Sequence, residues 1–60
     1  DLMIEHHNYF DIIDYKFSNI DDIHYKNQLI GYKNYIEKKT GKKANIYLYS
    51  IMNNQIKNVE

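Results

Sequence analysis

The residues best suited to chemistry are two aspartates and a lysine: Asp1, Asp14 and Lys16. Asp14 and Lys16 flank Tyr15 at the end of an apolar run, so in an extended strand they project from the same face. Hard divalent cations prefer carboxylate oxygens, and a nearby ammonium group can orient an attacking water or balance developing negative charge. Together these residue types predict metal-assisted hydrolysis of a phosphodiester. An Asp-x-Lys motif also occurs at solvated strand ends, so its meaning depends on the elements around it.

A β-hairpin is expected to bring Asp1 to the other two residues. Extended apolar segments cover about 2–7 and 9–16, and His7-Asn8 suits a tight turn between them because Asn tolerates positive φ. An antiparallel hairpin places the start of its first strand opposite the end of its second. Asp1 is therefore predicted to lie beside Asp14.

A helix is predicted over about 20–40. Ser18, Asn19 and Asp21 are its candidate N-caps, and Gly41 is expected to end it in a left-handed conformation. Apolar side chains recur at spacings of three and four along this segment. Gly31 lies within that pattern and indicates either close packing or a weak helix.

Two further strands are predicted, at about 44–52 and 55–59, with Asn53-Asn54 as the turn between them. The first of these strands carries large side chains on both sides, which predicts that both of its faces are covered. The order is then hairpin, helix, hairpin. Because the helix connects the two hairpins, it favours a parallel crossover, so the fold class is α/β of the mixed α+β kind with a mixed sheet.

Length and composition limit the function. A chain of 60 residues forms one small unit that buries only roughly 60% of its unfolded surface. Hydrophobic residues make up 43% and aromatic residues 15% of the chain, which indicates an ordered fold. Eight lysines balance eight acidic residues, there is no cysteine, and no segment approaches the about 20 apolar residues of a membrane span. We expect a soluble cytoplasmic protein with no membrane partner, and the abrupt ends predict a segment of a larger one.

Three segments of the sequence carry a resemblance to a known family. They are the run from Asp1 through Asp14-Tyr15-Lys16, then Tyr25-Lys26-Asn27-Gln28-Leu29 with Tyr32, and finally Ile46-Tyr47-Leu48-Tyr49-Ser50. This arrangement resembles the PD-(D/E)xK nuclease superfamily, and within it the C-terminal nuclease domain of the RecB and AddA type. The resemblance implies that residues 1–60 form part of such a domain, the core portion of a restriction-endonuclease-like fold.

The resemblance also assigns roles to particular residues. It implies that Asp1 and Asp14 bind Mg²⁺ or Mn²⁺, that the backbone carbonyl of Tyr15 is a further ligand, and that Lys16 is the catalytic lysine. Gln28 and Tyr32 match the glutamine and tyrosine of the family's helix motif, which lie beside the active site and approach the nucleic acid.

The function that the resemblance implies is metal-dependent cleavage of DNA by a bacterial ATP-dependent helicase-nuclease in double-strand-break repair and recombination. Its partners would be DNA, the remainder of the parent protein and a second subunit. Exonuclease action is expected over endonuclease action, and the isolated segment is expected to be inactive. Two alternatives stay open: a restriction or phage-exonuclease type of the same superfamily, or a non-catalytic α+β interaction module.

Other polar residues are predicted to have structural or surface roles. His6, His7 and His24 lack the convergent ligands that a zinc site needs. Glu5 and Asp11 are expected to pair with neighbours across the hairpin. Tyr25 is expected to be an ordinary core aromatic. The lysines near the end of the helix are expected to complement its dipole and solvate the loop, and they are Lys38, Lys39, Lys42 and Lys43.

Overall fold

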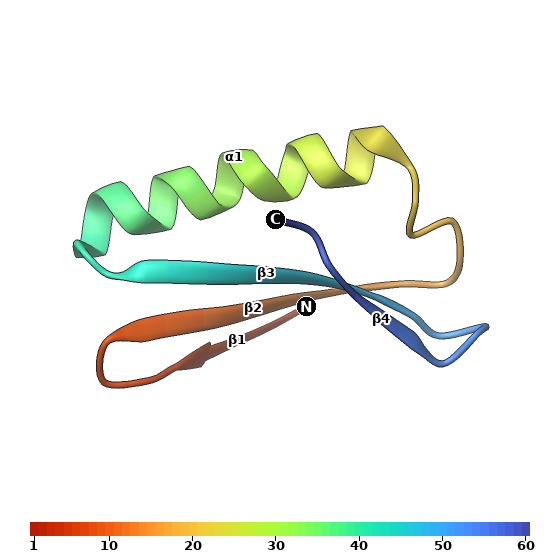
Figure 1. Cartoon of the computed structure of the whole chain (residues 1–60), viewed down its shortest axis with the longest axis horizontal. Helices are drawn as coiled ribbons and strands as arrows, with labels where there is room; N and C mark the ends of the chain where they lie inside the picture. Colours follow the sequence, from red (N-terminus) through yellow and green to blue (C-terminus); the bar gives the residue numbers. More distant parts are fainter.

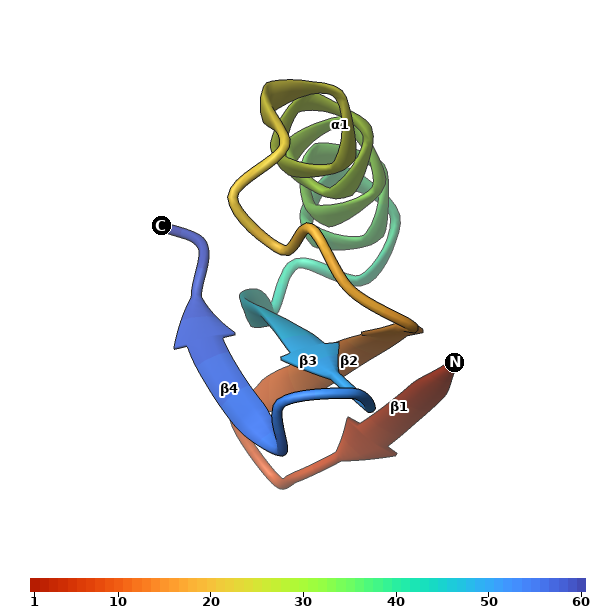
Figure 2. The ribbon, with the colours of Figure 1, turned by 90° about the vertical axis from the view of Figure 1, so that its right-hand side faces the viewer.

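The computed structural model describes residues 1–60 as a four-stranded sheet with one helix packed against one face (Figures 1 and 2). The elements are β1 (Leu2–Glu5), β2 (Tyr9–Lys16), α1 (Ile23–Thr40), β3 (Lys43–Ser50) and β4 (Gln55–Asn58). No helix is both long and apolar enough to cross a bilayer. The mixed α+β class is confirmed.

The sheet is mixed, with strands in the order β1-β2-β3-β4. β1 pairs with β2 and β3 with β4 in antiparallel hairpins, while β2 and β3 lie parallel in the centre. The parallel pair is possible because α1 carries the chain back across the sheet before β3 begins, as the sequence predicted. The carboxyl ends of β2 and β3 therefore meet at one edge of the sheet.

The helix begins at Ile23, three residues later than predicted. Asp22 is the N-cap, and its carboxylate accepts a hydrogen bond from the backbone N–H of His24 at 2.8 Å. The prediction of Ser18, Asn19 or Asp21 as the cap was wrong. Asn19 has a φ of 61° and its carbonyl accepts the N–H of Asp22 at 3.0 Å, so a tight turn holds this segment out of the helix.

The other end of the helix agrees with the prediction. Gly41 has a φ of 73°, and its N–H donates to the carbonyl of Glu37 at 2.9 Å. A Cβ added at Gly31 would meet nothing within 4 Å, so close packing does not explain that glycine. Of the two alternatives, Gly31 fits a position that weakens the helix.

Three strands differ in length from their predictions. β1 ends at Glu5 rather than near residue 7, because the N–H of His6 already donates to the carbonyl of Tyr9 and closes the turn. β3 covers 43–50 rather than 44–52, and the backbone N–H groups of Ile51 and Met52 beyond it donate to the carbonyls of Lys16 and Phe17 at the end of β2. β4 ends one residue early, because the N–H of Val59 donates to Ile46 of β3.

The core lies between the helix and one face of the sheet. It contains eight buried hydrophobic residues: Phe10, Ile12, Leu29, Ile36, Ala44, Ile46, Leu48 and Val59. On the other face of β3, Tyr47 and Tyr49 are only half-buried. The expectation that β3 would be covered on both faces was wrong for these residues, because the chain supplies a single helix and it packs on one side.

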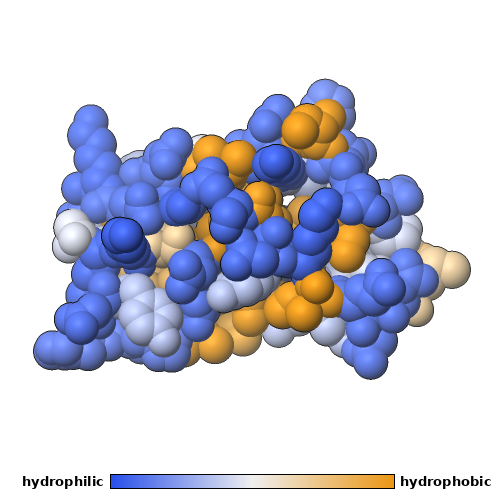
Figure 3. All heavy atoms as spheres, viewed as in Figure 1, coloured by the Kyte–Doolittle hydropathy of each residue, from blue (hydrophilic) through white to orange (hydrophobic).

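Hydrophilic side chains dominate the surface seen in Figure 3, with hydrophobic groups showing in patches between them. Inside, two polar residues interrupt the buried face of the sheet, Asp14 and Ser50. The Ser50 hydroxyl donates to the carbonyl of Phe17 at 3.4 Å and accepts the N–H of Asn53 at 3.3 Å, which ties together the ends of β2 and β3. Asp14 has a different environment.

Candidate functional site

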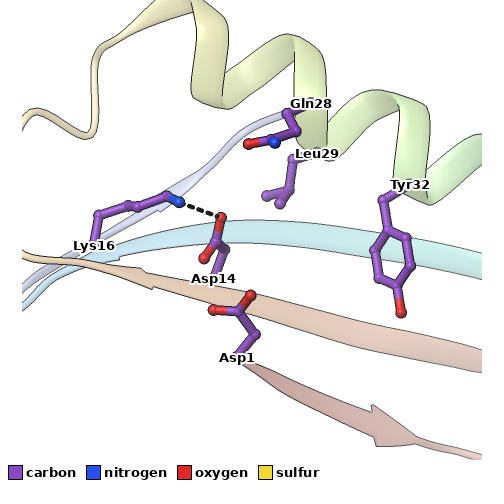
Figure 4. Close-up of a pocket in the computed structure, with 6 residues that line it drawn as sticks. All are labelled: Asp1, Asp14, Lys16, Gln28, Leu29 and Tyr32. Atoms are coloured by element: carbon purple, nitrogen blue, oxygen red, sulfur yellow. Dashed lines mark ion pairs between the residues drawn. The ribbon is translucent and has the colours of Figure 1, made fainter.

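Asp14 lines a cleft at the edge of the sheet where β2 ends. Leu2 pairs with Ile13 in the antiparallel hairpin, so the register continues with Asp1 opposite Asp14. In Figure 4 the carboxylate of Asp1 points toward Asp14, whose own carboxylate turns toward Lys16. The three residues are thus brought together, as the hairpin predicted. The cleft has a volume of about 330 Å³ and is lined by six residues: Asp1, Asp14, Lys16, Gln28, Leu29 and Tyr32.

The carboxylate of Asp14 is nearly enclosed, with 8% of its side chain exposed. Its only charged partner is Lys16, whose Nζ lies 3.3 Å from Oδ2. Asp14 lines the cleft, so its carboxylate is accessible from there. Among the side chains of the cleft lining, two are carboxylates and one is an ammonium group, so these side chains together carry an excess of negative charge. Such an excess in a partly buried cleft attracts a cation more strongly than the same charges would in open solvent.

Lys16 is held from a second side by an aromatic ring. Its Nζ lies 4.6 Å from the centroid of the Tyr25 ring, within the range of a cation–π contact. Tyr25 also packs against the core, so the predicted structural role is confirmed. The contact with Lys16 was missed by sequence reasoning. The available signal was spacing, since Tyr25 lies one helical turn before Gln28 and Leu29 and so faces the same side of the helix.

The roof of the cleft comes from α1. Gln28, Leu29 and Tyr32 project from the helix toward the strands (Figure 4), and Leu29 is buried at the back of the cleft. Gln28 and Tyr32 are both exposed, and Tyr32 retains 45% of its surface. The structure therefore places both helix residues of the predicted site over the aspartates, with polar groups that no core contact consumes.

The side chain of Tyr15 lies away from the cleft. Alternation along β2 sends its side chain to the opposite face of the sheet, where its ring lies edge-on to that of Tyr49 at 5.7 Å. The ring is absent from the cleft lining. A ligand role for Tyr15 would thus rest on its carbonyl oxygen, as the resemblance implies.

The donor set of the cleft suits a hard cation of a particular kind. No three or more His, Cys, Asp or Glu side chains converge anywhere in residues 1–60. Mg²⁺ retains several waters and is commonly bound through one or two carboxylates together with substrate phosphates. Asp1 and Asp14 supply that number of carboxylates, and the cleft leaves room for waters and a phosphate. The residues fit Mg²⁺ or Mn²⁺ and do not fit a closed structural zinc site.

No protein-family model matches the chain, and no curated protein or solved structure is significantly similar to it. The resemblance to the PD-(D/E)xK nucleases therefore stays a prediction from the motifs.

A second group of polar residues lies at the tip of the β1–β2 hairpin, away from the cleft. Glu5 accepts a hydrogen bond from Lys42 at 2.8 Å, and His6 Nε2 lies 3.0 Å from Asp11. Asn45 donates to the other oxygen of Asp11 at 3.2 Å. The predicted pairing across the hairpin is confirmed for Asp11 with His6, whereas the partner of Glu5 is Lys42, which lies outside the hairpin. The remaining histidines lie elsewhere, His7 in the hairpin turn and His24 in the first helical turn.

Proposed function

We propose that this chain is the catalytic part of a metal-dependent DNA nuclease of the PD-(D/E)xK type. The observation that supports it is the arrangement of one cleft: two neighbouring carboxylates at the open end of one hairpin, a lysine paired with one of them, and a glutamine and a tyrosine above. A purely structural charge cluster would be expected to neutralise itself. This one retains an excess of negative charge at an accessible position.

Asp1 and Asp14 would hold Mg²⁺ or Mn²⁺, with the carbonyl of Tyr15 as the further ligand that the resemblance implies. When bound, the metal would supply Lewis-acid polarisation of a phosphate oxygen and a lower pKa for a coordinated water. The enclosed position of Asp14 fixes one ligand in place, while the exposed Asp1 leaves its side of the cleft open to solvent and substrate.

Lys16 would act on the attacking water and the phosphate that the metal also contacts. Its ammonium, held at 3.3 Å from Asp14 and over the Tyr25 ring, donates hydrogen bonds to the attacking water or to a non-bridging phosphate oxygen. In the hydrolysis the water oxygen forms a bond to phosphorus and the ester P–O bond breaks. The attacking water gives up one proton to solvent, the departing sugar oxygen takes up one proton from solvent, and the phosphate product retains the negative charge that Lys16 balances.

Gln28 and Tyr32 position the nucleic acid strand. They lie four residues apart on one face of α1, so both side chains reach the same side of the cleft. The amide of Gln28 can donate to a phosphate or a base edge, and the exposed ring of Tyr32 can stack on a base.

The wider setting is part of the same proposal. The motif order from Asp1 through Asp14-Tyr15-Lys16 to Gln28 and Tyr32 supports the nuclease module of a bacterial helicase-nuclease acting in the cytoplasm on DNA breaks. A motor domain upstream of this module in the full-length protein would favour that setting over a restriction or phage-exonuclease type.

The test compares two carboxylates on the same strand. Asp14→Asn in the full-length protein is expected to abolish Mg²⁺-dependent cleavage of labelled DNA, because it removes the enclosed ligand. Asp11→Asn makes the same chemical change three residues away on the other face of β2, where Asp11 is paired with His6 and Asn45. The control is expected to cleave at the rate of the unchanged protein.

Two outcomes would overturn the proposal. Full activity in Asp14→Asn would show that the carboxylate is not a ligand. Absence of Mn²⁺ binding by the unchanged full-length protein, measured by titration calorimetry, would favour a non-catalytic interaction module instead.

A further inference from the structure

We infer that the helix continues the cleft as a track for a single DNA strand, with Tyr35 and Lys39 as the next contacts beyond Tyr32. This inference rests on the proposed nuclease function and names the form of its substrate. It goes beyond the cleft itself, because Tyr35 and Lys39 do not line the pocket that holds the carboxylates.

Helical spacing places these side chains in one row. Gln28, Tyr32, Tyr35 and Lys39 follow one another at intervals of four, three and four residues, so they share a single stripe of α1. The stripe extends about 16 Å along the axis at about 1.5 Å per residue. A strand with bases stacked at about 3.4 Å would place about five nucleotides along it.

The aromatic residues of this stripe are not used by the core. Tyr35 leaves 57% of its surface exposed and Tyr32 leaves 45%, whereas the buried stripe of the same helix runs through Leu29 and Ile36. Tyr32 and Tyr35 are three residues apart, about 4.5 Å along the axis, which is close to the spacing of neighbouring bases. Exposed aromatic rings at this spacing provide stacking surfaces for successive unpaired bases.

Lys39 adds the charge that a phosphate backbone requires. Its Nζ forms no ion pair with a carboxylate; it donates a hydrogen bond to the Tyr35 hydroxyl at 3.3 Å and lies 5.6 Å from the centre of that ring. At the tip of the neighbouring hairpin, the carboxylate of Glu5 is paired with Lys42 at 2.8 Å. A polyanion can therefore follow the stripe with one ammonium group free to meet a phosphate and no unpaired carboxylate of the hairpin tip against it.

A single strand fits better than a duplex. Stacking on Tyr32 and Tyr35 needs bases whose faces are free, and in a duplex both faces are covered by neighbouring base pairs. The strand would enter along Lys39 and Tyr35 and reach Tyr32 and the carboxylates with its backbone next to Lys16.

Binding is measured without divalent ions, so that cleavage does not enter, by the fluorescence anisotropy of a labelled oligothymidylate of about ten nucleotides. Tyr35→Ala is expected to weaken binding by the full-length protein about tenfold. Tyr35→Phe retains the stacking face and is expected to bind within about twofold of the unchanged protein. Both substitutions are at an exposed position, and circular dichroism checks that the helix is retained.

The charge is tested by salt dependence. Lys39→Gln is expected to lower the slope of log K against log salt by about 0.7, the value for one single-strand phosphate contact. Lys38→Gln removes the same charge one residue earlier, outside the stripe, and is expected to leave the slope unchanged.

Three results would each overturn the track. Tyr35→Ala could bind the oligonucleotide as tightly as the unchanged protein, or Tyr35→Phe could lose as much affinity as Tyr35→Ala. A duplex could also bind as tightly as the single strand. Failure of the nuclease proposal would look different: the unchanged protein would bind the oligonucleotide with the expected variant pattern yet show no Mg²⁺-dependent cleavage that Asp14→Asn removes.

Discussion

The two ends of the β1–β2 hairpin contain the same kinds of side chain in different balance. At the tip, Glu5 pairs with Lys42, and Asp11 is bonded by His6 and Asn45. At the open end, Asp1 lies beside Asp14, and of these two carboxylates only Asp14 is paired with a lysine, Lys16. Each end even has a lysine over an aromatic ring, Lys42 at 5.3 Å from Phe10 and Lys16 at 4.6 Å from Tyr25.

The two ends differ in how strongly their carboxylates can still attract a cation. Every carboxylate at the tip has a partner, so its remaining attraction for a cation is small and its contribution is to local stability. At the open end one carboxylate is enclosed and paired with Lys16, and the other is exposed without a lysine partner. Charge that the fold leaves uncompensated in a cleft is better evidence for a ligand site than the number of charged residues.

The largest effect is expected from removing the lysine at each end. Lys16→Gln should lower kcat for Mg²⁺-dependent DNA cleavage by about 10²–10³, the usual cost of losing one preorganised donor to a developing charge. Lys42→Gln removes the tip lysine and should leave kcat unchanged. Equal losses in both variants would mean that the two ends do not differ in function, and a single-turnover cleavage assay decides between these results.

Metal-dependent stability separates the same two ends without catalysis. Mn²⁺ at about 100 times its Kd should raise the free energy of unfolding by about 2.7 kcal/mol if it binds only the folded chain. Urea unfolding of Asp14→Asn should show no such increase, while Asp11→Asn should retain it. If both variants retain the stabilisation, the bound ion lies somewhere other than the cleft.

Much of the fold follows from local sequence signals, and the site depends on one tertiary relationship. The alternation in 9–16 and the turn at His7-Asn8 predicted the hairpin, and this alone brings Asp1 to Asp14. The helix connecting two strands predicted their parallel pairing. Each of these signals is local, so it survives without knowledge of the rest of the structure.

The features that sequence reasoning missed depend on backbone conformation or on contacts between elements. The left-handed conformation of Asn19 delays the helix to an Asp22 cap, although Asp21 and Asp22 are chemically identical candidates. The place of Tyr25 over Lys16 requires the angle between α1 and β2, which no periodicity encodes. The open second face of β3 depends on how many helices are available to cover it.

Tyr25 gives a smaller and more specific test of the open end. Tyr25→Leu removes the ring beneath Lys16 and should lower kcat several-fold, since a cation–π contact contributes about 0.5–2 kcal/mol. Tyr25→Phe retains the ring and should recover most of the rate. A merely structural role would instead lower the unfolding midpoint in parallel with activity, so both quantities are measured for each variant. The matching change at the tip, Phe10→Leu, alters the core without altering the lysine of the cleft.

The smallest effect is expected from a third paired charge, Lys33 of α1 with Glu60 after β4. The hydrogen bond from Glu60 raises the pKa of Lys33 above its ordinary value of 10.5, with burial of the lysine acting in the opposite direction. A raised pKa in the folded state means that the pair stabilises the fold fully below pH 10.5 and loses this contribution as pH rises through the folded pKa. Because the pair is at the surface, the contribution should be roughly 0.5 kcal/mol or less.

The test is urea unfolding of Lys33→Gln and of the unchanged chain, each at neutral and at strongly alkaline pH. Their free energies of unfolding should differ slightly at neutral pH and become equal at alkaline pH. Tyrosine titrations are common to both chains and cancel in the difference. A gap that widens with pH would contradict the assignment, and a gap as large as the Mn²⁺ effect would contradict the view that paired charges in this fold contribute little.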